Sequence, residues 1–157
     1  MHIVMVCGIP GCGKTTWIKS YIEDHPEEQC IHISRDEIRF GMISEDEDYF
    51  SKEDKVFDEF IRQIQEAIDN KIEVIFVDAT HISWRSRDKV FSQLDLKEYQ
   101  LQYVKFEVPA RVCMKRNNKR KGRACVPESV IRRMYWQSDN EFKDYGKYPH
   151  TIYVIKE

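Results

Sequence analysis

The sequence predicts a three-layer α/β domain built on a mainly parallel sheet, and three observations carry this prediction. Short apolar runs of strand type alternate along the whole chain with segments whose apolar residues recur at helical spacing. One of these runs, Val74-Ile-Phe-Val77, is apolar throughout, as expected for a parallel strand covered on both faces. The chain has 157 residues, which is the length of a single domain with one core. Alternation of this kind favours a parallel sheet, because parallel neighbours are joined by crossover helices.

The first half of the chain supplies three expected strands and three expected helices. The first helix is indicated by Trp17, Ile18, Tyr21 and Ile22, which follow an apolar run at helical spacing. A later segment forms one long amphipathic stripe: Val56, Phe57, Phe60, Ile61, Ile64, Ala67 and Ile68. The expected elements are strand 2–7, helix 16–23, strand 30–34, helix 35–41, helix 52–70 and strand 74–77.

The second half continues the alternation. A helix is expected over residues 84–94, and the alternating pattern of residues 100–108 predicts the next strand. Pro109 and Pro127 are each expected to open a helix, since proline fits the first turn, where its missing N–H is not needed. The run 151–155 predicts a final strand.

A phosphate-binding loop is indicated between the first strand and the first helix. Residues 8–15, Gly-Ile-Pro-Gly-Cys-Gly-Lys-Thr, match the pattern Gly-x-x-x-x-Gly-Lys-Ser/Thr. Glycines let the backbone aim its N–H groups at phosphate oxygens, and the following helix offers its positive end to the same anion. Lys14 is expected to reach the β and γ phosphates, and the Thr15 hydroxyl to hold Mg²⁺. The candidate nucleotide-binding residues are Gly8, Gly11, Cys12, Gly13, Lys14, Thr15 and Thr16.

A carboxylate and an arginine follow the second expected strand, within Ser34-Arg-Asp-Glu-Ile-Arg39. Ligands of open α/β sheets bind beyond the carboxyl ends of the strands, so this turn is expected to face the phosphate-binding loop. Asp36 could accept the proton of an attacking hydroxyl, and Arg39, three residues on, could hold an anionic group of the acceptor. The alternative is that Asp36 caps the helix and Arg39 is its surface partner.

Asp78 follows the third expected strand directly. An acid in this position is the Walker B arrangement, which binds Mg²⁺ directly or through water. The alternative is an aspartate that only begins the next turn.

Charge is segregated along the chain. Residues 111–123 hold seven basic residues and no acid, whereas residues 45–59 hold eight acids against two lysines. The acidic stretch is interpreted as a solvated helix face with its approach loop. The basic stretch predicts a lid over about residues 116–126, which could supply an arginine to the transferring phosphoryl group. The alternative is a solvated helix end whose cations complement the helix dipole.

Several classes of protein fit the sequence poorly. The nearest match to the guanine-binding pattern Asn-Lys-x-Asp is Asn118-Lys-Arg-Lys121, which lacks the aspartate, and the short chain argues against a motor. No apolar run approaches the roughly 18 residues of a membrane span. The five cysteines lack paired metal-ligand spacing, so we expect reduced thiols in a cytoplasmic enzyme without a signal peptide.

These clusters, in this order, resemble the kinase domain of the bacteriophage-type 5′-polynucleotide kinases. The resemblance extends from about Val4 to Gln137. It rests on five segments: Gly8 to Trp17, Ser34-Arg-Asp-Glu-Ile-Arg39, Val77-Asp78, Val112-Cys-Met-Lys-Arg-Asn-Asn-Lys-Arg120, and Val126-Pro to Met134-Tyr135. It implies a P-loop kinase fold over residues 1–157, with ATP as donor, Mg²⁺ as metal and a 5′-hydroxyl DNA or RNA end as acceptor. No phosphatase domain is expected beside the kinase domain.

The resemblance also implies residue roles. Asp36 would be the general base and Arg39 would grip the phosphate on the 3′ side of the acceptor nucleotide. Arg116 and Arg120 would contact the donor phosphates from the lid, and Asp78 would support the metal or the lid. A polar acceptor contact expected after the third strand is Ala79 here, with Thr80 as its substitute, and the lid carries an extra residue within 121–125.

The resulting hypothesis is an ATP-dependent 5′-hydroxyl polynucleotide kinase in nucleic-acid end repair. One alternative is a kinase of the same fold with a small-molecule or protein-bound hydroxyl acceptor. Another is a non-catalytic nucleotide-binding module. The sequence leaves open the choice between DNA and RNA, the donor base and the oligomeric state.

Overall fold

The computed structural model describes residues 1–143 and 146–157. Five strands form one sheet in the order β2-β3-β1-β4-β5, and every neighbouring pair is parallel. The strands are β1 (His2–Cys7), β2 (Cys30–Ser34), β3 (Val74–Asp78), β4 (Gln100–Glu107) and β5 (His150–Lys156). The predicted α/β class is therefore confirmed, and the predicted mainly parallel sheet is parallel throughout.

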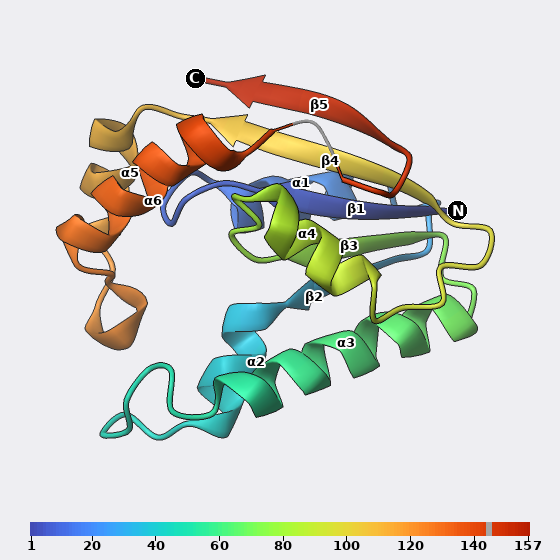
Figure 1. Cartoon of the computed structure of the whole chain (residues 1–157), viewed down its shortest axis with the longest axis horizontal. Coiled ribbons are helices and arrows are strands. Elements are labelled where there is room, and N and C mark those ends of the chain that lie inside the picture. Colours follow the sequence, from blue (N-terminus) through green and yellow to red (C-terminus); the bar gives the residue numbers. More distant parts are fainter. Residues whose placement is uncertain (144–145) are drawn as a thin grey trace.

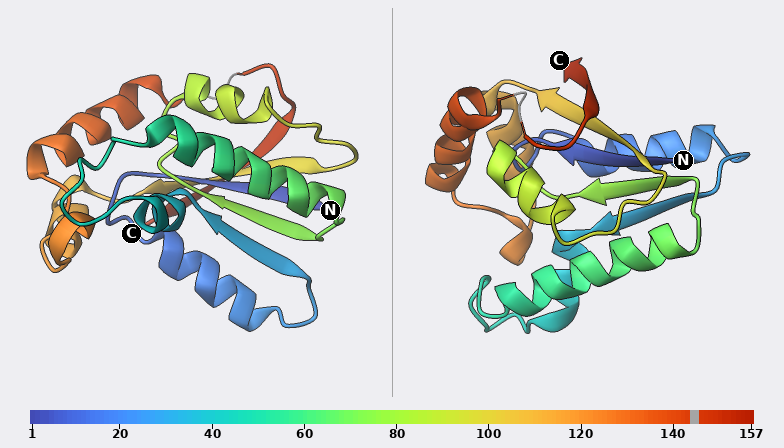
Figure 2. Two further views of the ribbon diagram at one scale, coloured as in Figure 1. Left: turned by 90° about the horizontal axis from the view of Figure 1, so that it is seen from below. Right: turned by 45° about the vertical axis from the view of Figure 1, so that its right-hand side comes forward.

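Helices cover both faces of the sheet and extend beyond its carboxyl edge. The helices are α1 (Lys14–Asp24), α2 (Arg35–Met42), α3 (Glu53–Asp69), α4 (Trp84–Phe91), α5 (Ala110–Asn117) and α6 (Glu128–Glu141), with a 3₁₀ turn η1 (Gly122–Ala124). Figure 1 shows α2, α5 and α6 at the end where the strand arrows point. Figure 2 shows α3 and α4 on one side of the sheet and α1 on the other, which gives three layers.

The central strand supplies both halves of the core. Ile3 and Met5 of β1 pack with the α3 residues Phe60 and Ile64, while their neighbours in sequence point to the opposite face. Val4 on that second face packs in the cluster that contains Ile18 of α1. Because successive side chains of a strand alternate between faces, an apolar run such as β1 can be buried on both.

The helix ends differ from the predictions by a few residues. The first helix begins at Lys14, directly after Gly13, rather than at residue 16, because the phosphate-binding loop passes straight into the helix. The fourth helix ends at Phe91 rather than 94, since the chain then tightens into turns whose N–H groups bond three residues back.

None of the helices within the described ranges is long and apolar enough to cross a membrane. All five cysteines are free thiols.

Candidate active site

The phosphate-binding loop is fixed by its backbone. Gly8 N–H donates to the Thr80 carbonyl at 2.9 Å, which joins the loop to the end of β3. Gly11 has φ +84°, and a Cβ there would lie 2.4 Å from the Cys113 carbonyl oxygen. Only glycine fits this position, because a side chain would be both strained and in collision with the backbone of α5.

The N-terminus of α1 lies at the end of this loop and has no side-chain cap. Its N-cap is Gly13, which has φ +99° and no side-chain oxygen to accept from the first helical N–H groups. The first N–H groups of a helix lack intrahelical partners and attract anions. A phosphate group therefore fits the N-terminus of α1.

Lys14 extends across the loop. Its ammonium Nζ donates to the carbonyl oxygens of Gly8 at 2.8 Å and Ile9 at 3.2 Å, and lies 3.6 Å from Cys12 Sγ. The Cys12 side chain packs in the core, so only the backbone of Cys12 could contact a phosphate. Thr16 is exposed at the start of α1.

Thr15 and Asp78 meet at the carboxyl ends of β1 and β3. The Thr15 hydroxyl donates to Asp78 Oδ2 at 2.9 Å, and His32 Nε2 lies 2.8 Å from the same oxygen. Burial raises the pKa of the Asp78 carboxyl, but the hydrogen bond to His32 and the charge of Lys14 outweigh it and lower the pKa below its usual value. Asp78 is therefore an ionised carboxylate beside a hydroxyl, a pair of hard oxygen donors that suits Mg²⁺. Within the described ranges, no group of three or more His, Cys, Asp or Glu side chains could hold a metal ion by itself.

Asp36 lies in the first turn of α2, at the same edge of the sheet as the phosphate-binding loop (Figure 1). Ser34, not Asp36, caps this helix, because the Ser34 hydroxyl accepts from the Glu37 N–H at 3.2 Å. The Asp36 side chain is 62% exposed. The capping alternative for Asp36 is thus wrong, and the exposed carboxylate can reach a ligand although one of its oxygens pairs with Arg39.

Arg39 is placed differently from the prediction. The side chain is buried, and all three of its nitrogens donate to protein oxygens. Nε and Nη2 contact both carboxylate oxygens of Glu53 at 2.8–3.1 Å, and Nη1 contacts Asp36 Oδ1 at 2.5 Å and the Tyr49 hydroxyl at 2.9 Å. The prediction that Arg39 offers a free guanidinium to an acceptor anion is therefore not met, because protein oxygens occupy its nitrogens.

Two residues of this cluster were missed by the sequence analysis. Glu53 and Tyr49 belong to the acidic stretch that we interpreted as a solvated helix face. Glu53 instead pairs with both Arg35 and Arg39, and these pairs lower its pKa although burial alone would raise it. The only signal in the sequence is the excess of acids near two arginines, which does not say which acid pairs with which arginine.

The predicted lid divides into a fixed base and an exposed loop. At the base, the fully buried Asn117 side chain donates to the Val126 carbonyl at 2.6 Å and accepts from the Val126 N–H at 2.9 Å. Arg116 lies beside the phosphate-binding loop, where it donates to the Gly11 carbonyl at 3.4 Å and to Glu157 at 2.6 Å. Arg120 is exposed on the loop that Asn117 and Val126 close. The side chain of Arg123, the last of the basic cluster, lies outside the described part of the chain.

One family model covers most of the chain, including the phosphate-binding loop and Asp78. Residues 3–137 match the family model described as an AAA domain. The chain belongs to the AAA domain family. This AAA domain has the P-loop kinase fold, as the sequence predicted.

Relatives of this AAA domain include named kinases. A curated L-seryl-tRNA(Sec) kinase of Methanococcus maripaludis is 28% identical over 153 residues, which is 92% of this chain and 55% of that protein. A chain in the structure of the Pnkp1/Rnl/Hen1 RNA repair complex matches 95% of this chain and 48% of its own length, with a TM-score of 0.78 and 22% identity. A gluconokinase from Sinorhizobium meliloti 1021 matches 98% of this chain and 82% of its own, with a TM-score of 0.58 and 18% identity. The AAA domain thus spans about half the length of the first two of these proteins.

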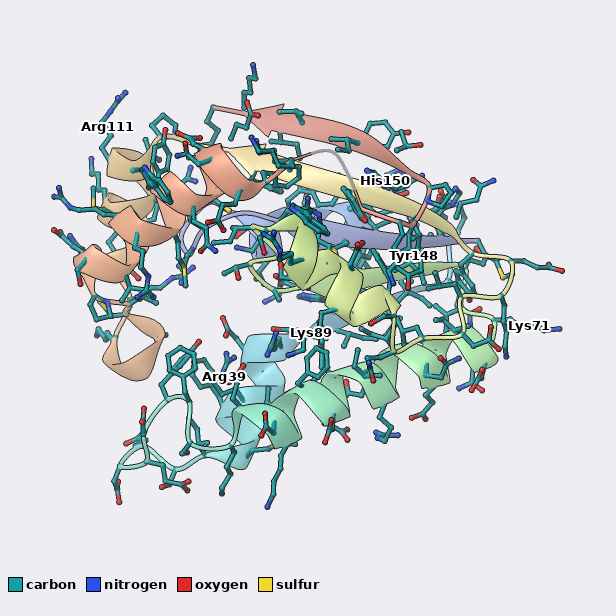
Figure 3. All side chains as sticks on the ribbon, in the orientation of Figure 1. Arg39, Lys71, Lys89, Arg111, Tyr148 and His150 are labelled. Atoms are coloured by element: carbon teal, nitrogen blue, oxygen red, sulfur yellow. The ribbon has the colours of Figure 1, made fainter. Side chains whose placement is uncertain are left out.

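Two cations of the AAA domain stack on one aromatic ring, that of Phe57 in α3. Lys89 Nζ of α4 lies 4.5 Å from the centroid of the Phe57 ring, and the Arg35 guanidinium lies 5.3 Å from the same centroid. Figure 3 shows Lys89 between α4 and the helices α2 and α3, and Arg39 beside α2. Within the described chain, Lys89 has no salt-bridge partner, so its charge is available to an anion.

Asp78 of the AAA domain carries a testable dependence of stability on pH. Because its folded-state pKa is lowered, the carboxylate stabilises the fold above the unfolded pKa of about 3.9 and loses that effect as the pH falls through the folded value. We expect Asp78→Asn to lower the free energy of unfolding by about 1–3 kcal/mol at pH 7 and by progressively less below about pH 4. Urea titrations at a series of pH values check this, with Asp139→Asn on the exposed face of α6 as the control. If the loss of unfolding free energy in Asp78→Asn stayed constant down to pH 2, Asp78 would not be ionised in the folded protein.

Proposed function

We propose that this domain transfers the γ-phosphate of ATP to the 5′-hydroxyl of a DNA or RNA strand, in nucleic-acid end repair. The observation that carries the proposal is the position of Asp36. An exposed carboxylate lies at the same edge of the sheet as a lysine and a helix N-terminus built for phosphate. A base on one side and a phosphate site on the other are the two requirements for phosphorylating a hydroxyl group.

The donor side is assigned to the loop and the lid. The backbone N–H groups from Gly11 to Thr15 would hold the phosphates, and Lys14 would place its charge against the β and γ phosphates. Thr15 and Asp78 would hold Mg²⁺, which neutralises charge on the phosphate oxygens when bound. Arg116 lies beside Gly11 and would contact the donor phosphates, and Arg120 would approach the γ-phosphate from the lid loop.

The chemical step is a single displacement. The acceptor hydroxyl oxygen forms a bond to the γ-phosphorus while the bond between that phosphorus and the β–γ bridging oxygen breaks. The hydroxyl proton passes to the Asp36 carboxylate, and ADP leaves. Thr80, whose carbonyl joins β3 to the phosphate-binding loop, would lie near the acceptor. Arg39 would act by holding Asp36 rather than by gripping a phosphate, since its nitrogens are occupied.

Two cations stacked on an aromatic ring and two relatives support a nucleic-acid acceptor. Arg35 and Lys89 on Phe57 form a cationic and aromatic wall of the kind that suits a phosphate backbone and its bases. One relative comes from an RNA repair complex and the other is named for seryl-tRNA, and they match 95% and 92% of this chain. Because a gluconokinase has a similar structure, a small-molecule acceptor is the main alternative.

The direct test is transfer of labelled γ-phosphate from ATP to a panel of acceptors. The panel contains 5′-hydroxyl DNA and RNA oligonucleotides, the same strands already carrying a 5′-phosphate, 3′-nucleotides, nucleosides, gluconate and a seryl-tRNA. We expect labelling of the 5′-hydroxyl strands and none of their 5′-phosphorylated partners. Preferential labelling of gluconate, a nucleoside or the seryl group would replace the proposed acceptor. Tight ATP binding without any transfer would favour the non-catalytic module.

Lys89 offers a specific check of the acceptor wall. We expect Lys89→Ala to raise the KM for a 5′-hydroxyl oligonucleotide by about three- to tenfold with little change in kcat, because it removes one phosphate contact. The slope of log(kcat/KM) against log[salt] should fall in magnitude by about one. Lys71→Ala is the matched control, because Lys71 lies at the far end of α3 (Figure 3). If Lys71→Ala had the same effects as Lys89→Ala, Lys89 would not contact the acceptor.

A further inference from the structure

Asp36 is held through one of its two oxygens. Arg39 Nη1 donates to Asp36 Oδ1 at 2.5 Å, and the Tyr49 hydroxyl donates to the same oxygen at 2.9 Å. Asp36 Oδ2 accepts no hydrogen bond from any residue that the structure describes. The side chain is otherwise exposed, so Oδ2 is the oxygen that faces incoming ligands.

The residues that hold Oδ1 form a continuous network. The Tyr49 hydroxyl accepts from Arg39 Nη1 at 2.9 Å while it donates to Asp36, so its one proton is committed. Burial, followed by the Asp36 charge, raises the pKa of Tyr49, which therefore remains a protonated donor. The Arg39 guanidinium also lies 4.4 Å from the centroid of the Tyr49 ring, so the two side chains fix each other by stacking as well.

Glu53 anchors the far side of this network. Both of its carboxylate oxygens accept from Arg39, in the two-pronged geometry that fixes a guanidinium plane. Burial lowers the pKa of Arg39, but the hydrogen bond to Glu53 outweighs that effect and raises it, so the cation is permanent. Arg39 lies between α2 and the loop that leads into α3 (Figure 3), and this pair ties the two helices together.

We propose that Glu53, Arg39 and Tyr49 are positioning residues, which hold Asp36 by Oδ1 so that Oδ2 takes the proton of the acceptor hydroxyl. This inference rests on the proposed kinase function and deepens it. Two donors on one oxygen restrict rotation of the carboxylate and fix the direction of the free oxygen, which a general base requires. The 43–52 loop thereby contributes to catalysis through the contact of Tyr49 with Asp36.

The test compares Tyr49→Phe and Glu53→Gln with wild type in single-turnover transfer to a 5′-hydroxyl oligonucleotide. Tyr49→Phe deletes only the hydroxyl, and we expect the rate of transfer to fall about tenfold while the KM values for ATP and acceptor stay within twofold. Glu53→Gln should lower the rate of transfer by about 10- to 100-fold, because Arg39 loses the negative charge of Glu53. Tyr153→Phe, which removes an exposed hydroxyl from β5, is the matched control and should leave the rate unchanged.

Arg35→Gln separates the two partners of Glu53, because it removes the Arg35–Glu53 pair and leaves the Arg39–Glu53 pair in place. We expect its rate of chemistry to fall less than that of Glu53→Gln.

A double-mutant cycle then distinguishes positioning from general stability. If Tyr49 acts through Asp36, Tyr49→Phe should have no further effect in an Asp36→Asn background.

Additive losses in both backgrounds, a normal rate for Tyr49→Phe, or a loss confined to KM or melting temperature would each overturn the positioning role. A wild-type protein that transfers phosphate to no 5′-hydroxyl strand would instead overturn the proposed function, and the inference with it. The two failures are thus distinguished by the wild-type reaction.

Discussion

Lys14→Ala should abolish phosphoryl transfer while leaving the fold intact. Lys14 is the only lysine of the phosphate-binding loop, and its ammonium lies over that loop within hydrogen-bonding distance of the Gly8 and Ile9 carbonyls. In the proposed reaction, the Lys14 ammonium contacts the β and γ phosphates and stabilises the negative charge that develops as the bond between them breaks. Removing a charge of this kind costs a rate factor of at least about 10³, because no neighbouring group can replace it.

The measurement is single-turnover transfer at saturating ATP, with circular dichroism and thermal melting to verify the fold. Lys19→Ala is the matched control, since Lys19 is an exposed lysine on the same helix, five residues after Lys14. Lys19→Ala should retain wild-type turnover. If Lys14→Ala also turned over within a few-fold of wild type, the loop would not be the donor site.

Arg120→Ala should lower kcat by about 10³, the effect expected when an arginine that stabilises the transferring phosphoryl group is lost. Arg120 is exposed on a loop whose two ends are joined by the Asn117–Val126 hydrogen bonds. A fixed base with an exposed tip allows the tip to approach the cleft without unfolding the lid. Arg120→Lys should restore little, because an ammonium cannot reproduce the planar, two-pronged contact with phosphoryl oxygens.

The control for the lid is Lys121→Ala, the adjacent exposed cation, which should reduce kcat by much less. Rapid-quench kinetics with saturating ATP and acceptor separate the chemical step from binding for all three variants. Comparable, mild effects of Arg120→Ala and Lys121→Ala would mean that the basic stretch is a solvated helix end, the alternative that the sequence left open.

The sequence was sufficient to predict the sheet and the phosphate-binding loop. Apolar runs such as β1 and β3, and the amphipathic stripe of α3, report burial directly, because the hydrophobic period depends only on local geometry. The meeting of Thr15 with Asp78 could also be expected from the sequence, since the loop before Thr15 follows β1 and Asp78 ends the adjacent parallel strand β3.

The Arg39 network could not be predicted in the same way. Glu53 lies 14 residues from Arg39, across a loop whose path has no periodicity, and eight acids of that stretch were possible partners. The choice among them depends on how the 43–52 loop folds back over α2. The same is true of the lid, where the pairing of Asn117 with Val126 depends on the closing of an irregular loop.

The central claim is that Asp36 activates a 5′-hydroxyl for attack on the γ-phosphate of ATP. The most direct measurement is single-turnover transfer from γ-labelled ATP to a 5′-hydroxyl oligonucleotide by wild type and Asp36→Asn, with the position of the label determined by nuclease digestion. The account predicts label on the 5′-terminal nucleotide only, and a rate that falls by about 10²–10⁴ in Asp36→Asn while the Kd for ATP is unchanged. A normal rate of chemistry in Asp36→Asn, or label at any other position of the strand, would contradict it.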